Sequence, residues 1–522
     1  MFYKKINLDL VKKNRIELSF FFILISISIF FRVYNLEFWR LPSRDESILI
    51  YHSNKPIIDS IINFYDISKT FFPSVLWVNF FPFVNTFIEY RYFAAMTTVL
   101  GFIILYFTLK KISNWKIALF LSLFFCVNYN ILYVSRMFLV DMLDLVFVPL
   151  ILFFYIKWYQ NRDIKYTYLV FIFLGLSLIN HLILIYFVTI FLLWFIFLLW
   201  KKEVDLRTFL ISLMFFLIIL SSFLPKYVKF FYTSFSDYMS YRYAISGLKG
   251  QNFFMNFMDP LQFFDKLFIF FTSKNILNQF LNINIFLDVI VLFIFFYPFI
   301  LFLFFKLKHK KFKKISYFLY FISYGIFLII FLSIIPITFI QHFTFFYIPF
   351  LCILAHLLTY KTKLTKILIL VIIPVIILNF VLSLLLINNN SYSTLQKIWP
   401  KKINRIMIDG PAYATLEYTY FLNNYEIYIF HTTREGIYSV PKDNTNNYTF
   451  ANFRRFVLFD PNFFIEKNIT KNDIIITVND IIDLYGDISK GPDDVLNNDY
   501  FRINVSLEYI GNVDNIEIFR VI

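Results

Sequence analysis

Runs of about 20 apolar residues recur through the first three quarters of the chain and restrict its fold more than any other feature. A helix needs about that many apolar residues to cross a hydrocarbon core of roughly 30 Å. The chain has 522 residues, of which 59% are hydrophobic and only 16% charged. Such a composition predicts a polytopic membrane protein, because a soluble protein cannot bury so much apolar surface. The single-span runs lie at 17–34, 92–109, 116–134, 140–157, 207–225, 285–306 and 365–388.

Two longer apolar runs have to be divided. Residues 166–200 as one helix would be about 52 Å long at 1.5 Å per residue, which is too long for a single crossing. The polar pair Asn180-His181 near its middle is the predicted turn. Residues 315–358 divide at Pro336, because a proline inside a helix removes a hydrogen bond and clashes with the preceding turn. The predicted total is eleven transmembrane helices.

Basic residues mark one side of this topology. With a cytoplasmic N-terminus, each short inside segment is basic, from MFYKKINLDLVKKNR at the start to KLKHKKFKK at 306–314 and the last segment with Lys361, Lys363 and Lys366, as the positive-inside rule expects. The net charge of +15 reports this orientation. The basic residues are scattered over short loops rather than clustered on one soluble face, which argues against nucleic-acid binding. We expect a multi-pass protein of the cytoplasmic (inner) cell membrane, in contact with membrane lipids, whose first span is an uncleaved signal anchor.

The topology places three segments outside the cytoplasm: the loop 35–91, the loop 226–284 and the residues 389–522. The last segment contains short apolar runs such as RIMID, YEIYIF and DIIITV between Gly, Pro and Asn, which are typical of strands. The fold class expected is therefore an all-α membrane domain over 1–388, followed by a small extracytoplasmic α/β domain over 389–522.

Acidic residues gather at the outer ends of the predicted spans. Asp45 and Glu46 follow Arg44 in the loop RLPSRDESILIY, where a solvated loop is the simpler interpretation. Asp141 and Asp144 are three residues apart, hence on one face of the fourth span. Such carboxylates can cap a helix, but within an apolar span they more often face a cavity with a function. Arg136, just before them, is a candidate counter-charge or anion ligand.

The order of these features resembles the GT-C membrane glycosyltransferases, specifically the protein O-mannosyltransferase and lipid A aminoarabinose transferase-like group (glycosyltransferase families 39 and 83). The resemblance covers about residues 15–200. The chain departs from the group at His181, where a lysine is frequent, and at His342 and Tyr347 in QHFTFFYIPF, where the group often has Arg-Tyr. The residues that match the motifs of the group are Asp45, Glu46, Tyr51, Arg91, Arg136 and Asp141.

The resemblance implies transfer of a sugar from a polyprenyl-phosphate donor to an extracytoplasmic lipid, glycan or protein. An inverting transfer needs a base that deprotonates the acceptor, and Asp45 is the first candidate, with Glu46 second. Arginine steadies a departing phosphate through its bidentate fork. No cofactor is implied with certainty, although Asp141 and Asp144 are candidates to hold a divalent cation. The candidate phosphate ligands are Arg44, Arg91, Arg136 and Arg242.

Two other classes of protein stay open. A transporter or flippase with eleven spans would use the same charged residues as substrate ligands, but internal repeats are then expected and none is visible. A non-catalytic membrane scaffold would bind its partner through residues 389–522. Release of sugar from a labelled polyprenyl-phosphate sugar separates the enzyme from both.

Reporter fusions after residues 60, 112, 204, 310 and 450 test the predicted topology. We expect them to report outside, inside, inside, inside and outside, because the basic segments stay in the cytoplasm. A cytoplasmic signal at 450 would contradict both the number of spans and the location of the acidic residues.

Overall fold

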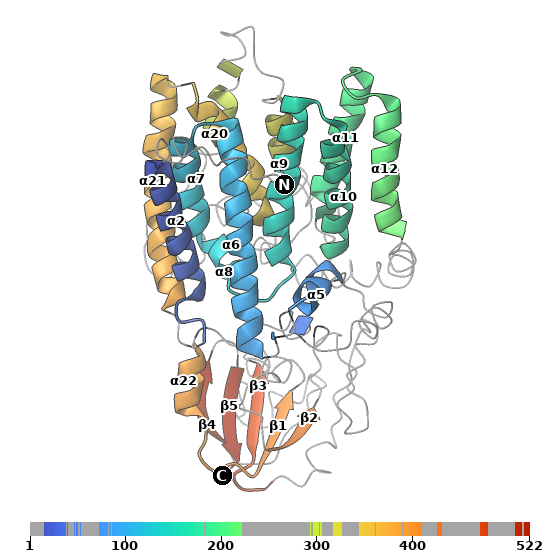
Figure 1. The fold of residues 1–522 in the computed structure, drawn as a ribbon. Helices are drawn as coiled ribbons and strands as arrows, with labels where there is room; N and C mark the ends of the chain where they lie inside the picture. Colours follow the sequence, from blue (N-terminus) through green and yellow to red (C-terminus); the bar gives the residue numbers. More distant parts are fainter. Residues whose placement is uncertain are drawn as a thin grey trace, which may run out of the picture.

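The computed structural model describes the chain in segments. They are residues 15–37, 39, 46, 49–50, 53, 72–81, 83–84, 86–181, 184–221, 293, 296–301, 303–304, 317–325, 344–360, 362–388, 391–409, 425–430, 470–478, 507–513 and 516–521. Most of these segments form a helical bundle, and the last ones form a small sheet (Figure 1). The predicted combination of an all-α membrane domain with a C-terminal α/β part is confirmed.

The bundle is built from helices that follow the apolar runs of the sequence. Most of them stand side by side, whereas α5 and α22 lie at one end of the bundle, near the sheet (Figure 1). The helices are α2 (Arg15–Val33), α5 (Phe72–Asn79), α6 (Phe87–Ile112), α7 (Trp115–Val127), α8 (Tyr129–Ser135), α9 (Asp141–Asn161), α10 (Ile164–Asn180), α11 (Ile185–Trp200), α12 (Leu206–Ser221), α20 (Tyr347–Leu358), α21 (Lys363–Ile387) and α22 (Ser391–Ile398).

Four described helices are long and apolar enough to cross a membrane: α2, α6, α9 and residues 365–387 of α21. The pair α7 and α8, bent by 63°, counts as a fifth if it forms one broken span. Helices α10, α11 and α12 are apolar but shorter. The chain is therefore a multi-pass membrane protein. The predicted spans at 285–306 and 315–335 lie largely outside the described residues, so the total of eleven stays a prediction.

The predicted break at Asn180-His181 is confirmed, since α10 ends at Asn180 and α11 begins at Ile185. The predicted single span 116–134 is instead interrupted at Asn128, between α7 and α8. The Asn128 side chain accepts from the Ile131 N–H at 3.0 Å, and the Asn379 side chain of α21 accepts from the Tyr129 N–H at 3.1 Å. These two contacts satisfy backbone groups that the break exposes, which apolar surroundings require.

The predicted outer loop 35–91 ends earlier than the sequence suggested. Helix α6 begins at Phe87, because Thr86 and Glu89 form a capping box that satisfies the first backbone donors. Arg91 consequently lies inside the helix rather than in the loop. The short helix α5 lies within this predicted loop, whereas residues 54–71 lie outside the described residues.

The C-terminal sheet has the strand order β2-β1-β3-β5-β4. Its strands are β1 (Arg405–Asp409), β2 (Glu426–Phe430), β3 (Ile474–Val478), β4 (Leu507–Val513) and β5 (Ile516–Val521). Strand β1 pairs in parallel with β2 and β3, whereas β5 pairs antiparallel with β3 and β4. Isoleucines of β1, β3 and β5 form its core with Leu395 of α22.

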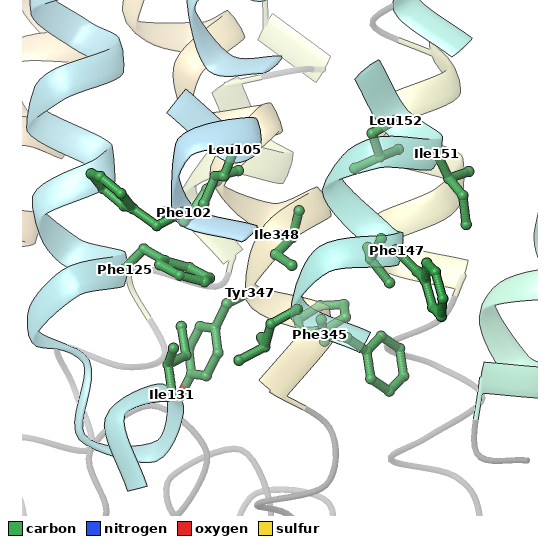
Figure 2. Packing of buried hydrophobic residues seen from close by; sticks show 14 of the residues in the cluster. Phe102, Leu105, Phe125, Ile131, Phe147, Ile151, Leu152, Phe345, Tyr347 and Ile348 are labelled. Carbon is green, nitrogen blue, oxygen red and sulfur yellow. The ribbon is translucent and has the colours of Figure 1, made fainter. Parts of the chain in front are cut away.

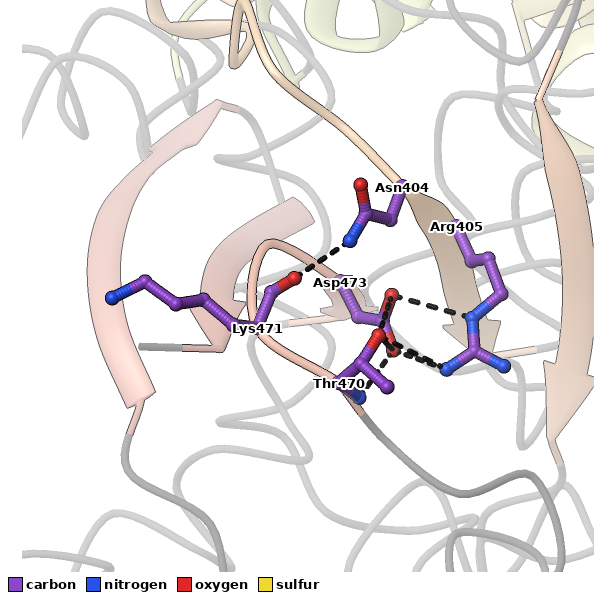
Figure 3. Close-up of polar contacts among 5 residues, drawn as sticks. All are labelled: Asn404, Arg405, Thr470, Lys471 and Asp473. Atoms are coloured by element: carbon purple, nitrogen blue, oxygen red, sulfur yellow. Dashed lines mark hydrogen bonds and ion pairs between the residues drawn. The ribbon is translucent and has the colours of Figure 1, made fainter.

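An ion pair joins the beginnings of β1 and β3. Arg405 Nη2 donates to Asp473 Oδ2 at 2.6 Å, and Thr470 N–H donates to the same oxygen at 2.8 Å (Figure 3). Asn404 Nδ2 donates to the Lys471 carbonyl at 2.7 Å beside it. These contacts fix the register of the parallel pair at its start.

The sheet lies at the end of the bundle where α2 and α21 end and α6 and α9 begin (Figure 1). We call this end the sheet end. Deeper in the bundle the contacts are apolar and aromatic, as between Phe102 of α6 and Phe125 of α7, whose rings are 6.5 Å apart (Figure 2). In lipid, close packing rather than burial from water holds such helices together.

Helices α6 and α9 are in close backbone contact at Gly101. A Cβ atom there would lie 2.3 Å from the Leu145 carbonyl oxygen, which is backbone and cannot rotate away. We expect Gly101→Ala to lower the free energy of unfolding by about 1–3 kcal/mol through overpacking. Thermal unfolding of the purified chain in detergent measures it.

Gly175→Ala is the matched control. A Cβ atom at Gly175 would meet only the Ile219 side chain, at 3.1 Å, and that side chain can shift. An effect of Gly175→Ala as large as that of Gly101→Ala would contradict the close backbone contact of α6 with α9.

Candidate functional site

A buried ion pair joins the segment between α2 and α5 to α6 at the sheet end. Arg91 Nε donates to Glu46 Oε1 and Arg91 Nη2 donates to Glu46 Oε2, each at 2.9 Å. The Phe138 N–H, from the turn between α8 and α9, donates to Glu46 Oε1 at 3.0 Å. The side chains of Glu46 and Arg91 are 0% and 1% exposed. Glu46 therefore ties three segments of the chain together.

Aromatic rings surround the Arg91 guanidinium. Its Cζ atom lies 4.2 Å from the ring centre of Phe87 and 5.1 Å from that of Trp39. Phe87 is one helical turn before Arg91 in α6, so the helix itself brings ring and cation together. Trp39 is held in place because its indole N–H donates to the Leu386 carbonyl at 3.0 Å, near the end of α21.

Arg136 lies in the turn between α8 and α9 and is completely buried. Its Nη1 donates to the carbonyls of Phe31 and Tyr34 at 2.8 and 2.9 Å, so it caps the C-terminal end of α2, where a helix favours positive charge. Its Cζ also lies 4.7 Å from the Trp39 ring centre. Burial, followed by the positive charge of Arg91, lowers the pKa of Arg136.

A second polar cluster forms where α9 begins and α10 ends. Possible ligand atoms of Asp141, Asp144 and His181 all lie within 4.8 Å of one another. His181 Nδ1 is 2.5 Å from Asp144 Oδ2, and Asn180 Nδ2 donates to Asp144 Oδ1 at 2.9 Å. Ser74 of α5 in turn donates to Asn180 Oδ1 at 2.7 Å. Both oxygens of Asp144 are thereby held in fixed directions.

This cluster has the donor types that bind divalent cations, since carboxylate and imidazole suit zinc and manganese. Histidines that bind metals usually donate their other ring N–H to a carboxylate, which orients the imidazole. The contact of His181 Nδ1 with Asp144 fits that arrangement. Asp144 would then orient His181, and the direct ligands would be Asp141 and His181 Nε2.

Of the remaining predicted site residues, one lies in the bundle and the others lie outside the described residues. Tyr347 is buried at the beginning of α20, and its hydroxyl accepts from Asn130 Nδ2 of α8 at 3.3 Å. It therefore joins α20 to α8. The others, Arg44, Asp45, Tyr51, Arg242 and His342, lie outside the described residues.

Three contributors to the site were missed in the sequence: Ser74, Trp39 and Arg32. Arg32 is buried in the last turn of α2, where its Nε donates to Thr98 of α6 at 3.1 Å. An arginine near the end of an apolar span is a signal that could have found it, because charges within spans are rare and costly. Nothing in the sequence separates Trp39 or Ser74 from other residues of their segments.

The ion pair of Glu46 with Arg91 is expected to dominate the stability of the sheet end. Glu46→Gln leaves the buried guanidinium without its counter-charge, so the free energy of unfolding should fall by about 3–5 kcal/mol. Equilibrium unfolding of the full chain in mixed detergent micelles measures this loss.

Glu203→Gln is the control, because its partner Arg162 is 47% exposed and the pair is 3.3 Å long. Exposed pairs contribute about 0–1 kcal/mol. Equal losses from the two substitutions would show that the Glu46–Arg91 pair adds nothing beyond a surface contact.

Comparison with known proteins gives one family match. Residues 75–228 match the family described as dolichyl-phosphate-mannose-protein mannosyltransferase. This segment includes Arg91, Arg136, Asp141, Asp144 and His181. No curated protein sequence matches the chain.

Among solved structures, ArnT from Cupriavidus metallidurans bound to undecaprenyl phosphate is 10% identical, with a TM-score of 0.49 and coverage of 97% of this chain and 98% of that chain. The oligosaccharyltransferase from Archaeoglobus fulgidus in complex with Zn and sulfate is 13% identical, with a TM-score of 0.46 and coverage of 88% and 68%. The match over 75–228 is the finding that bears on the site. It confirms the resemblance that the motifs predict: this chain is similar to the membrane glycosyltransferases of the GT-C group.

Proposed function

We propose that this chain transfers a sugar from a polyprenyl-phosphate donor to an acceptor at the sheet end of the bundle. The observation that carries the proposal is the gathering of buried charge at this end, within and beside the segment that matches the family. Burying a carboxylate within a span costs about 2.5–3.5 kcal/mol. Asp141 and Asp144 are each 1% exposed, which favours a function over simple packing.

The transfer requires a base and a leaving group. The acceptor oxygen attacks the anomeric carbon, the bond from that carbon to the phosphate oxygen breaks, and the acceptor proton passes to a carboxylate. The lipid phosphate leaves with the bonding electron pair. The configuration at the anomeric carbon inverts in this single displacement.

Asp45 is the carboxylate we assign as the base, in preference to Glu46. Both oxygens of Glu46 accept from Arg91, and one also accepts from the Phe138 N–H. A carboxylate whose two oxygens are engaged in this way is committed to the ion pair rather than to an acceptor hydroxyl. Glu46 would position the loop that carries Asp45.

The cluster of Asp141, Asp144 and His181 is the proposed place for a divalent cation. A cation bound there would supply positive charge to the departing phosphate. Within this chain, Asp144 and Asn180 would keep the His181 ring in one orientation.

The acceptor is an extracytoplasmic lipid, glycan or protein in this proposal. The C-terminal sheet lies next to the end of the bundle where α6 and α9 begin (Figure 1). This location supports a role for residues 389–522 in shaping the acceptor site.

Asp45→Asn tests the proposed reaction. It keeps the shape of the side chain but removes the proton acceptor, so sugar transfer from a labelled polyprenyl-phosphate sugar should fall by about 10²–10⁴. The assay uses the full chain in membranes and measures labelled product and released sugar. Transfer by Asp45→Asn within a few-fold of the unmodified chain would remove Asp45 as the base.

Asp163→Asn is the control for this substitution. Asp163 caps α10 at the opposite end of the bundle, and its side chain accepts from the Lys165 N–H at 3.1 Å. The same change of carboxylate to amide should leave transfer unaltered there.

A further inference from the structure

The end of the bundle away from the sheet carries the turn from α9 to α10 and the turn from α11 to α12 (Figure 1). We call residues 157–166 and 200–207 the basic turns. An ion pair joins them, because Arg162 Nη2 lies 3.3 Å from Glu203 Oε2. The basic turns hold six basic residues (Lys157, Arg162, Lys165, Lys201, Lys202 and Arg207) and three acidic ones (Asp163, Glu203 and Asp205). Together they form one surface on which positive charge is in excess.

All three carboxylates of the basic turns are already in use. Asp163 Oδ2 lies 2.7 Å from Lys165 Nζ. Asp205 accepts from the Thr208 N–H at 2.8 Å in the first turn of α12, and Glu203 forms the pair that joins the turns. Within the part of the chain that the structure describes, three lysines of the turns form no ion pair: Lys157, Lys201 and Lys202.

Aromatic rings lie against the cations of both turns. Lys201 Nζ is 4.2 Å from the ring centre of Trp200, and Arg162 Cζ is 4.9 Å from that of Trp158. Tryptophan beside lysine or arginine is typical of the border between hydrocarbon and lipid headgroups, where the ring lies at headgroup level and the cation extends into the polar layer. Trp200 is 72% exposed, so its free face is open to lipid.

The backbone places two of these cations where a basic residue is unusual. Arg162 and Lys202 follow the ends of α9 and α11 with φ angles of 56° and 57°. This left-handed conformation favours glycine or asparagine, and the other two described non-glycine residues that adopt it are Asn35 and Asn472. The positive-inside rule requires basic residues in a loop but not at strained positions. The placement of the charge, and not only its amount, therefore indicates a ligand.

An exposed apolar stripe of α11 leads to the same cations. Leu193, Ile196 and Trp200 follow one another at helical spacing, so they share one face of α11, and all three are exposed. Lys201 and Lys202 come directly after this stripe. An acyl chain that lies along the stripe would bring its headgroup to the two lysines.

We propose that the basic turns bind the headgroup of an anionic phospholipid, with its phosphate at Lys201 and Lys202 and an acyl chain along the stripe of α11. Each lysine or arginine near a membrane surface strengthens the attraction of anionic lipid, and basic pockets between helices bind such headgroups. The bound lipid is a partner of the fold and not the sugar donor, because the basic turns lie at the end away from the candidate functional site. The inference goes beyond the proposed function and does not depend on sugar transfer.

Native mass spectrometry of the full purified chain tests the proposal by measuring which lipid stays bound. With dioleoyl-phosphatidylglycerol and dioleoyl-phosphatidylcholine offered in equal amounts, we expect the anionic lipid to be retained about tenfold more. The two lipids have the same acyl chains, so their ratio reports the charge of the headgroup. Equal retention by the unmodified chain overturns the proposal, and this result does not depend on the folding of any variant.

A variant with both Lys201→Gln and Lys202→Gln locates the site. Its preference for phosphatidylglycerol should fall by about tenfold, because two charges at the headgroup are lost. The control combines Lys401→Gln with Lys402→Gln, an exposed pair of adjacent lysines between α22 and β1, and changes the net charge equally. An unaltered preference in the first variant, or an equal fall in the control, overturns the proposal.

A soluble anion is the other possible occupant of the basic turns. Inorganic phosphate is therefore added to the chain with bound phosphatidylglycerol and compared with chloride at the same ionic strength, since salt alone screens exposed charges. Retention of the lipid in both solutions supports a lipid headgroup as the ligand. Displacement by phosphate but not by chloride would assign the turns to a soluble anion and overturn the proposal.

Discussion

The bidentate contact of Arg91 with Glu46 is the interaction on which the sheet end depends. It joins the segment between α2 and α5 to α6, and through the Phe138 N–H it also fixes the turn between α8 and α9. Neither charge can be removed alone, because the other would remain buried without compensation. The position of Arg136, two residues before Phe138, follows from this pair.

Polar side chains in the bundle fall into two groups, according to whether they bond to backbone groups or to each other. The first group forms hydrogen bonds with backbone groups at the break between α7 and α8 and consists of Asn128, Asn379 and Ser383, which donates to the Val127 carbonyl at 2.8 Å. Those contacts replace hydrogen bonds that the broken helix has lost. Asp144 and His181 instead hold each other, and no break in α9 requires them. The first group is accounted for by the fold, whereas the second is not.

The sequence predicted features whose signals are local. The acidic face of Asp141 and Asp144, the break at Asn180 and the strands of the C-terminal sheet each depend on residues a few positions apart. The break at Asn128 was missed, because its partner Asn379 is 251 residues away in the chain. The contact of Glu46 with Arg91 spans 45 residues. Helical periodicity carries no information on such pairs, so they appear only in three dimensions.

The two ends of α2 and α6 hold their buried charges in different ways. At the end opposite the sheet, Glu17 accepts from the Tyr106 hydroxyl and from Lys110, so each buried charge there has an opposite partner. At the sheet end, Arg32 and Arg136 are buried without a carboxylate partner in the described segments. Arg136 is held by the carbonyls of Phe31 and Tyr34, and Arg32 by Thr98 and Ser28, so neutral oxygens rather than carboxylates stabilise these two cations. Asp141 and Asp144 are buried at the same end and contact other groups, so the charges there are gathered without being paired one to one.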